Sequence, residues 1–311
     1  MALATAGAYL SQSVDGFEDY LEQYNDRWND LSQYSTGPID YEERTLYSTW
    51  NVSFQQVQHQ DPEAAELLKL MAYLDNQDLW YELFQAGASD IPAWWDELLS
   101  SRARFNRAIS RLHEYSLIEV NEGRCSLHAC VHDWTLEYLN REPEQEKSKI
   151  AIHCVAASVI WKSEADYWVK NRRVLPHARR FQLVRLQPLI GGSQIEPADL
   201  SYLAALYEQN DKMVEAEEMY LRALQGYEKA WGAEHTSTLA TVNNLGVLYK
   251  NQGKMVEAEE MLLRALRGYE KTWGAEHTST LDTVNNLGVL YKNQGKMVRS
   301  EEHTSELQSP A

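Results

Sequence analysis

Residues 206–247 and 248–289 are two copies of one 42-residue sequence, and this repetition restricts the possible folds more than any other feature. The copies differ at only eight of their 42 positions. A tandem period between about 20 and 50 residues is typical of solenoids, in which each unit packs mainly on its neighbours. We therefore expect the last third of the chain to stack repeated units in a row.

Each copy contains two stretches of helical periodicity separated by a short polar break. Apolar residues recur at spacings of three and four, as expected where one face of a helix is buried. The first helix carries Leu239, Val242, Leu245, Gly246 and Tyr249, and the second carries Ala258, Leu262, Ala265 and Leu266. The small Gly246 should allow a close helix approach. Because such a helix pair cannot bury its apolar face alone, the sequence predicts a mainly α-helical solenoid.

The pattern of residue sizes resembles the tetratricopeptide repeat. The large, small, aromatic, small and small positions of that motif are matched by Leu245, Gly246, Tyr249, Ala258 and Ala265. The late proline of the motif is absent, and Glu270 lies near its place. The 42-residue length and the connector at 232–239, repeated at 274–281, resemble the kinesin light chain subtype. The resemblance implies an array of helix pairs that binds proteins or peptides.

One stripe of the first helix lies away from its apolar side, at about 100° per residue. In the two copies this stripe comprises Ala240, Asn243, Val247 and Lys250, and Asp282, Asn285, Val289 and Lys292. In tetratricopeptide arrays these positions line the concave groove, and the resemblance implies that Asn243 and Asn285 contact the backbone of an extended peptide. An amide suits this task because it both donates and accepts hydrogen bonds. Alternatively, both asparagines persist only because the repeats were duplicated recently.

The acidic balance of the chain limits its partners. Its formal net charge is −17 and its pI is near 5.0, which disfavours binding to nucleic acid or to anionic membranes. No apolar run approaches the length of a membrane span. The three cysteines, Cys125, Cys130 and Cys154, give no disulfide framework, so we expect a cytoplasmic protein.

The N-terminal half begins as a series of helices. Periodicity predicts helices over residues 2–13, 16–35 and 49–58. Asp61-Pro62-Glu63 should open the next helix, because proline suits the first helical turn and acidic side chains suit the helix dipole.

From Trp94 onward the pattern changes. A helix over about 102–115 precedes two β-prone runs at 116–121 and 124–127, and another helix follows through Leu139. The two runs are joined by Glu122-Gly123, which predicts a β-hairpin. Three helices followed by a hairpin describe a winged-helix domain.

This half resembles the region that follows the nucleotide-binding module in NB-ARC proteins, the regulatory ATPases of NOD-like receptors. The resemblance rests on Ala2–Leu10, Thr49–Ser53 and Leu127-His128-Ala129. The last stretch matches the family's Met-His-Asp motif, with leucine and alanine in place of methionine and aspartate. In the family this histidine approaches the phosphates of bound ADP and holds the switch closed. The resemblance therefore implies a nucleotide-sensing role for His128.

The nucleotide-binding loop itself does not occur in the sequence. No Gly-x-x-x-x-Gly-Lys-[Ser/Thr] is present, and Gly253-Lys254 has Leu248 at the first glycine position and Met255 after the lysine. Without this loop the chain lacks the backbone N–H cradle for phosphate and the hydroxyl for Mg²⁺. We therefore predict a chain that is not an enzyme, with no catalytic residue, metal or cofactor, and assign ADP or ATP to the NB-ARC core of a longer parent protein.

Two features of this half favour other kinds of site. The helix that would enter a DNA major groove carries Arg102, Arg104, Arg107 and Arg111. The acidic total charge disfavours DNA binding. Potential zinc ligands within eight residues are Cys125, His128, Cys130 and His132. Their spacings of three, two and two match no tetrahedral motif, so we expect no metal site.

The remaining segments are a connector, a hinge and a tail. The connector ends in a basic cluster that we expect to be a solvated face, Arg172-Arg173, Arg179-Arg180 and Arg185. Gly191-Gly192-Ser193 should form the hinge into the repeats. Residues 299–311 break the repeat and resemble the in-frame translation of a sequencing-library adapter.

The predicted organisation has five parts: a helical segment at 1–60, a winged helix at 61–140, a helical connector at 141–197, tetratricopeptide repeats at 198–298 and the adapter-like tail at 299–311. The combination of families implies a fragment of a regulatory switch protein, in which the repeats sense a protein or peptide and the NB-ARC core responds. The alternative is a self-contained adaptor whose repeats bind peptides without switching.

Overall fold

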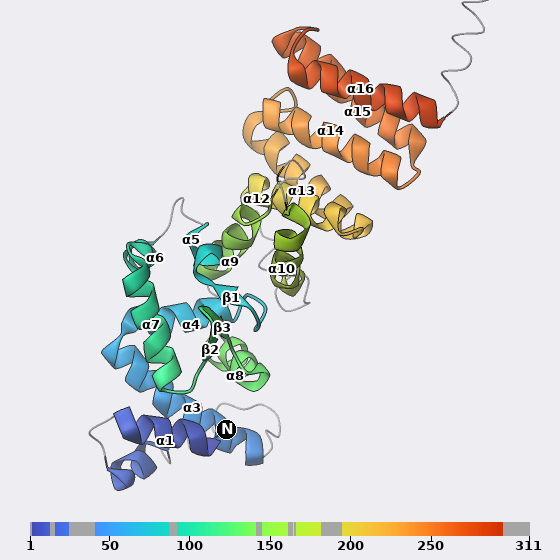
Figure 1. The fold of residues 1–311 in the computed structure, drawn as a ribbon. Helices are drawn as coiled ribbons and strands as arrows, with labels where there is room; N and C mark the ends of the chain where they lie inside the picture. Colours follow the sequence, from blue (N-terminus) through green and yellow to red (C-terminus); the bar gives the residue numbers. More distant parts are fainter. Residues whose placement is uncertain are drawn as a thin grey trace, which may run out of the picture. The chain divides into compact units, whose positions relative to one another are not determined.

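The computed structural model describes residues 2–12, 16–24, 41–86, 92–140, 145–160, 164, 166–181 and 195–294. The chain forms two compact units. Unit 1 comprises Met1–Ile160 and Arg173–Gly192, and unit 2 comprises Trp161–Arg172 and Ser193–Ala311. Both units are mainly helical, as predicted, and the sheet formed by the described residues lies in unit 1 (Figure 1).

Unit 1 contains short helices and a small sheet. Residues 17–24 are helical, and α10 (Tyr167–Arg180) contributes its residues 173–180 to this unit. The other helices are α1 (Ala2–Gln12), α3 (Tyr41–Gln60), α4 (Pro62–Met71), α5 (Tyr81–Gln85), α6 (Ala93–Leu99), α7 (Arg102–Glu114), α8 (Ala129–Trp134), the π-helix η1 (Thr135–Leu139) and α9 (Gln145–Ala157). The strands are β1 (Leu79–Trp80), β2 (Glu119–Asn121) and β3 (Arg124–Ser126).

The predicted helices at the start of unit 1 are largely confirmed. α1 matches the first, and residues 17–24 match the start of the second, whose remainder lies outside the described residues. α3 begins at Tyr41 rather than at Thr49, because its first turns lack the apolar periodicity on which the prediction relied. α4 opens at Pro62 as predicted, and the Asp61 carboxylate accepts a hydrogen bond from the Ala64 N–H at 3.0 Å.

The predicted hairpin is confirmed. β2 and β3 pair antiparallel, with Val120 opposite Cys125. Glu122 and Gly123 have φ values of 48° and 77°, as a type I′ turn requires. β1 pairs with the other edge of β3, which gives the order β1-β3-β2. The sequence does not predict β1, because a strand of two residues has no detectable period.

The core of unit 1 is rich in aromatic rings. Trp50 of α3 and Trp134 of α8 are fully buried, with ring centroids 5.8 Å apart. Phe54 meets Trp134 edge to face at 6.1 Å. α8 continues directly into the π-helix η1, so the predicted helix through Leu139 is confirmed with a wider final turn.

Part of α10 packs on the segment around β1. The Arg173 guanidinium donates two hydrogen bonds to the Asp78 carboxylate, at 2.8 and 2.9 Å, and lies 4.1 Å from the Trp80 ring centroid. Nδ1 of the buried His177 accepts a hydrogen bond from the Asp75 N–H at 3.2 Å. These bonds satisfy backbone and side-chain groups of a loop that has no regular structure of its own.

The prediction that the basic cluster forms a solvated face is wrong for two of its arginines. Arg173 and Arg180 are half-buried, and Arg180 donates to Nδ1 of the buried His132 at 3.2 Å. Arg172 and Arg179 are exposed, and Arg185 lies outside the described residues. The partners of Arg173 and Arg180 lie 95 and 48 residues away, so no local pattern reveals them.

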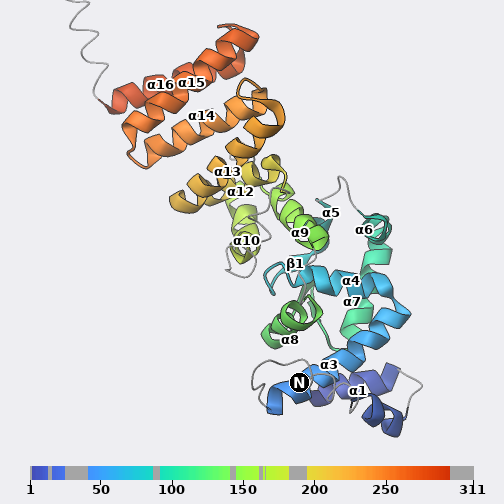
Figure 2. The ribbon, with the colours of Figure 1, turned by 180° about the vertical axis from the view of Figure 1, so that it is seen from behind.

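Unit 2 is a stack of helices. Besides residues 167–172 of α10, its elements are α12 (Pro197–Gln209), α13 (Met213–Trp231), α14 (Thr236–Asn251), α15 (Met255–Trp273) and α16 (Thr278–Asn293). Both views show α14, α15 and α16 side by side (Figures 1 and 2). The predicted mainly α fold with a repeat solenoid is therefore confirmed.

The residues expected to pack between the repeat helices do so. Leu239, Val242 and Leu245 of α14 are buried. A Cβ at Gly246 would lie 2.7 Å from Cγ of Leu262, so the glycine is required for the close approach of α15.

The connectors between repeats have the same geometry in both copies. Thr238 Oγ1 donates to the Gly232 carbonyl at 2.8 Å, and Thr280 Oγ1 donates to the Gly274 carbonyl at 2.8 Å. Both glycines have positive φ, at 89° and 88°, as expected for residues that end a helix.

The predicted hinge at Gly191-Gly192-Ser193 and the tail at 299–311 lie outside the described residues. None of the described helices combines the length and the apolar character needed to cross a membrane.

Candidate functional site

The predicted groove residues lie on α14 and α16, the first helices of two successive repeats. Val289, Asn285 and Lys292 of α16 are exposed, and Val289 is 39% accessible. The equivalent residues of α14, Val247, Asn243 and Lys250, are half-buried. Each helix thus carries an amide, a β-branched apolar side chain and an ammonium group along one side, as the sequence predicts.

The two asparagines differ in their hydrogen bonds. Asn243 Oδ1 accepts from Thr283 Oγ1 and from Asn286 Nδ2, both at 3.2 Å. This oxygen therefore joins α14 to α16, and the Asn243 NH₂ group remains as a donor for a ligand. The Asn285 side chain makes no hydrogen bond within the described residues, so its amide oxygen and its NH₂ group are both open to a ligand.

Neither Lys250 nor Lys292 makes a salt bridge in the part of the chain that the structure describes. The neighbouring Lys254 does form a salt bridge, in which its Nζ lies 2.7 Å from the Glu217 carboxylate. Burial would raise the pKa of Glu217, but hydrogen bonds from Lys254 and Gln252 hold it below its ordinary value. The two groove lysines thus present charge to solvent, whereas Lys254 is used in packing.

α12 corresponds to α14 one period earlier, and the sequence prediction of groove residues did not include it. Glu208 of α12 lies one 42-residue period before Lys250 of α14 and so occupies the equivalent position. Its carboxylate accepts from Asn251 Nδ2 at 3.3 Å and from Tyr220 OH at 3.4 Å. The period could have identified this position, but α12 has diverged so far that the 42-residue match begins only at Leu206.

His128 lies at the N-cap of α8 in unit 1. Its ring is exposed, and Nδ1 accepts from the Cys130 N–H at 3.3 Å. In the neutral ring the proton then resides on Nε2, which can donate to an oxygen. The preceding Leu127 is buried, and its backbone N–H and carbonyl bond to Asn76, each at 2.8 Å. The local geometry leaves His128 available for a ligand and does not identify one.

The four potential zinc ligands do not converge. Cys125 is buried in β3, its thiol donates to the Leu79 carbonyl at 3.5 Å, and burial raises its pKa to about 12. His132 is also buried, whereas His128 and Cys130 are exposed. Among the described residues, no group of three His, Cys, Asp or Glu side chains is placed to hold a metal ion.

Most arginines on α7 are paired with carboxylates. Arg104 lies 2.7 Å from Glu63 and 3.1 Å from Glu97, and Arg102 lies 3.0 Å from Glu82. Arg111 pairs with Glu114 at 2.9 Å, which leaves Arg107 without an ion pair among the described residues. The helix therefore offers little free positive charge to a DNA backbone.

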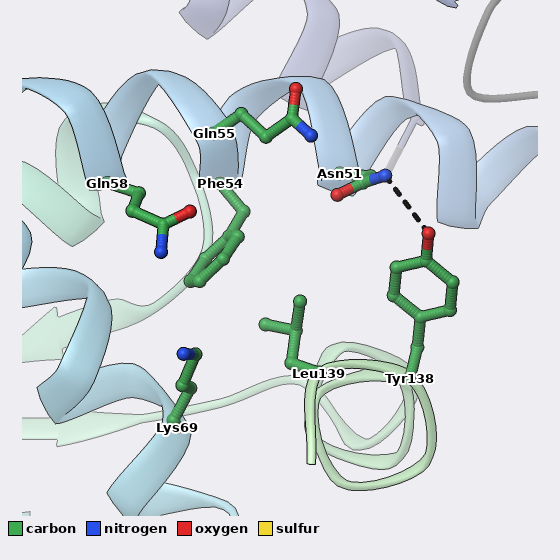
Figure 3. Close-up of a pocket in the computed structure, with 7 residues that line it drawn as sticks. All are labelled: Asn51, Phe54, Gln55, Gln58, Lys69, Tyr138 and Leu139. Atoms are coloured by element: carbon green, nitrogen blue, oxygen red, sulfur yellow. Dashed lines mark hydrogen bonds between the residues drawn. The ribbon is translucent and has the colours of Figure 1, made fainter. Parts of the chain in front are cut away.

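An open surface pocket of about 400 Å³ lies between α3, α4 and η1. It is lined by Asn51, Phe54, Gln55, Gln58, Lys69, Tyr138 and Leu139 (Figure 3). Asn51 Nδ2 donates to Tyr138 OH at 3.3 Å, and Lys69 pairs with Glu66 at 3.0 Å. Burial would raise the pKa of Glu66, but Lys147 and Lys69 hold it below its ordinary value. Lys69 is the charged side chain of this lining, and its partner Glu66 also pairs with Lys147.

The comparisons with known proteins identify the family of the repeats. Residues 198–271 and 237–303 match the family model of the tetratricopeptide repeat, so the solenoid of unit 2 consists of tetratricopeptide repeats. A nucleotide-binding leucine-rich repeat (NLR)-like protein of Hyaloscypha variabilis is 28% identical in an alignment 261 positions long, which covers 78% of this chain and 24% of that protein. The chain thus spans about a quarter of that relative's length.

One solved structure has similar extent but low similarity. The crystal structure of BtubC (BKLC) from P. vanneervenii matches 96% of this chain and 95% of its own, with 15% identity. The TM-score is 0.41, a value that does not imply a shared architecture. The tetratricopeptide repeats of unit 2 imply protein–protein interaction.

Proposed function

We propose that the repeats bind an extended peptide segment of a partner protein along α12, α14 and α16. The observation that carries this proposal is the open amide of Asn285, which lies on the same side of α16 as the exposed Val289 and Lys292. An amide with free donor and acceptor groups can pair with a peptide backbone, while valine and lysine side chains contact the side chains of the peptide.

The groove is tested with a peptide selected on the full chain from a phage-displayed random library. Asn285→Ala should weaken binding about tenfold, because a buried hydrogen bond contributes on the order of 1 kcal/mol. Asn285 makes no bond to another repeat, so this substitution leaves the packing unchanged. Asn243→Ala combined with Asn285→Ala should abolish binding.

The matched control is Val256→Ala on α15, whose side chain is 68% exposed and lies outside the groove. Its affinity should stay within about twofold of the unaltered chain. Wild-type affinity of the double asparagine variant would remove the groove proposal.

We further propose that the parent protein is a regulatory nucleotide-dependent switch, in which unit 1 packs on an NB-ARC core and the repeats sense the ligand. Three observations support this proposal: the hairpin that follows α7, the motif Leu127-His128-Ala129, and the printed name of the fungal relative. The order of elements from α4 to β3, helices followed by a hairpin, supports the proposal of a winged helix, which in NB-ARC proteins follows the nucleotide-binding module. The kinesin light chain character of the repeats likewise remains a proposal from the connector sequence.

His128 is tested in the parent protein reassembled from this chain and its nucleotide-binding core. His128→Ala should speed the release of a fluorescent ADP analogue, because the Nε2 donor is lost. Cys130→Ala is the matched control, since only the backbone N–H of Cys130 bonds to His128. Equal ADP release by both variants would contradict the switch role and leave the self-contained adaptor, which binds through the groove without a nucleotide.

A further inference from the structure

The residue before His128 is clamped by a loop that is distant in the sequence. Leu127 is fully buried, and its N–H donates to the Asn76 carbonyl at 2.8 Å, while Asn76 Nδ2 donates to the Leu127 carbonyl at 2.8 Å. Gln77 Nε2 makes a longer bond to the same carbonyl, at 3.4 Å. Because hydrogen bonds in both directions fix the position and the orientation of Leu127, the backbone that carries the His128 ring has little freedom.

The loop that carries Asn76 is held by Arg173 and His177, which lie about one turn apart on α10 and which we call the α10 face. The Arg173 guanidinium donates to the Asp78 carboxylate at 2.8 and 2.9 Å, and His177 Nδ1 accepts from the Asp75 N–H at 3.2 Å. Asp78 has a φ of 52°, a left-handed conformation that is uncommon outside glycine. Asn76 lies between the two anchored residues, so the α10 face fixes the loop on both sides of it.

Two histidines of unit 2 cap a helix as His128 does, but their rings are held in a different way. Nδ1 of His235 and of His277 accepts from the N–H two residues later, at 3.3 and 3.2 Å. Their ring centroids also lie 4.4 and 4.2 Å from those of Trp231 and Trp273. The His128 ring is exposed and makes no ring contact within the described residues. Its orientation therefore depends on the backbone that carries it.

We infer that Asn76 is a positioning residue for His128, and that the α10 face holds its loop in place. This inference rests on the proposed switch, in which Nε2 of His128 donates to an oxygen of bound ADP, and it names the residues that direct this donor. Asn76 needs no contact with the nucleotide. Without its clamp the backbone at Leu127 can shift, and the His128 ring no longer points to one place.

The first test is NMR of the full chain alone, so its result does not depend on the nucleotide. His128 Nδ1 accepts from the Cys130 N–H at 3.3 Å, which places the proton of the neutral ring on Nε2. Nitrogen-15 shifts of the ring distinguish this tautomer from the one protonated on Nδ1. We expect the neutral His128 ring to show mainly the Nε2–H form, as the rings of His235 and His277 should.

Asn76→Asp keeps the size of the side chain and replaces its NH₂ donor by an acceptor. The new carboxylate cannot donate to the Leu127 carbonyl, so His128 should show both tautomers while the two capping rings of unit 2 keep one. Asn76→Gln retains an NH₂ donor and should restore the signals in part. Asn106→Asp is the matched control, since Asn106 of α7 is exposed and makes no hydrogen bond within the described residues.

The second test is the release of a fluorescent ADP analogue from the reassembled parent protein. Asn76→Asp should speed release about fivefold, the effect of one lost hydrogen bond. It should have no further effect in the His128→Ala chain, because it acts through that ring. Arg173→Ala should also speed release, and its combination with Asn76→Asp should be no faster than the faster single variant, since both loosen the same loop. Asn106→Asp should release ADP as the unaltered chain does.

The inference is overturned if Asn76→Asp leaves the His128 ring signals as they are in Asn106→Asp, or if it speeds ADP release equally with and without the His128 ring. It is also overturned if the indole N–H signals of the buried Trp50 and Trp134 change together with those of His128, because the whole core of unit 1 has then loosened. Normal ADP retention by His128→Ala would contradict the switch itself, and the ring signals would still decide whether Asn76 positions His128.

Discussion

The two units are stabilised in different ways. In unit 2, equivalent residues of successive repeats make the same contact. Gln252 Nε2 donates to the Met213 carbonyl at 3.1 Å, and one period later Gln294 Nε2 donates to the Met255 carbonyl at 3.4 Å. Unit 1 makes each contact once, between residues as far apart in the sequence as Arg173 and Asp78. A substitution in unit 2 therefore has an internal control one period away, whereas a substitution in unit 1 has none.

The largest effect should come from the aromatic core of unit 1. Trp134→Ala removes a fully buried indole that contacts Trp50 and Phe54, and such deletions cost about 3 to 5 kcal/mol. In calorimetry only one of two unfolding transitions should move, because Trp134 lies within unit 1. Trp134→Phe keeps a ring and removes an indole N–H that has no acceptor among the described residues, so it should cost less. A shift of both transitions by Trp134→Ala would contradict two independent units.

The next effect is a loss of stability in acid, confined to unit 1. Burial lowers the pKa of His177 to about 4, opposed by the nearby Asp75 and Asp78 and assisted by Arg173. Burial also lowers the pKa of His132. Both rings are buried, and both use Nδ1 as an acceptor, so protonation removes a hydrogen bond and places charge in the core.

The sign of the pH effect follows from the depressed pKa. His177 binds its proton at about pH 6.5 in the unfolded chain and only near pH 4 in the folded chain. The stability that the neutral ring contributes is therefore present above pH 6.5 and is lost as the pH falls towards 4. For His177 the total loss is on the order of 3 kcal/mol. Urea titrations between pH 7 and 5 should show this slope, and His177→Gln should reduce it, because glutamine accepts a hydrogen bond without titrating. An unchanged slope in His177→Gln would assign the acid sensitivity to other groups.

The contacts of His132 and His177 are of a kind that the sequence does not predict, because their partners lie far away in the chain. Repetition predicts the helix pairs, the role of Gly246 and the stripe that holds Asn243 and Asn285, because each follows from positions within one period. It does not predict that Asn243 bonds to Thr283 and Asn286, which depends on the rotation of α16 relative to α14. In unit 1 the hairpin is encoded by its turn, but the partners of Arg173 and His177 depend on how a distant loop is folded.

A smaller effect compares identical residues in two repeats. Leu239→Ala should destabilise unit 2 by about 2 to 3 kcal/mol, because its buried side chain fills the space over Gly268. Leu281→Ala, one period later, should change stability by less than about 0.5 kcal/mol, because Leu281 is 53% exposed. Thermal unfolding of the two variants checks the difference. Equal costs would show that Leu281 is covered in solution, for instance by a second copy.

The smallest effect is expected when an ion pair is altered, and one pair from each unit can be compared. Arg173→Lys should destabilise unit 1 by about 1 kcal/mol, since lysine keeps the charge but loses the two-point hydrogen bond to Asp78 and the contact with Trp80. Lys271→Ala in unit 2 should have no measurable effect, because the side chains of Lys271 and Glu234 are 71% and 59% exposed. Urea midpoints for the two variants measure both. If the two substitutions lower the free energy of unfolding equally, the ion pair of unit 1 is no more stabilising than the surface pair of unit 2. The two units would then differ only in their apolar cores.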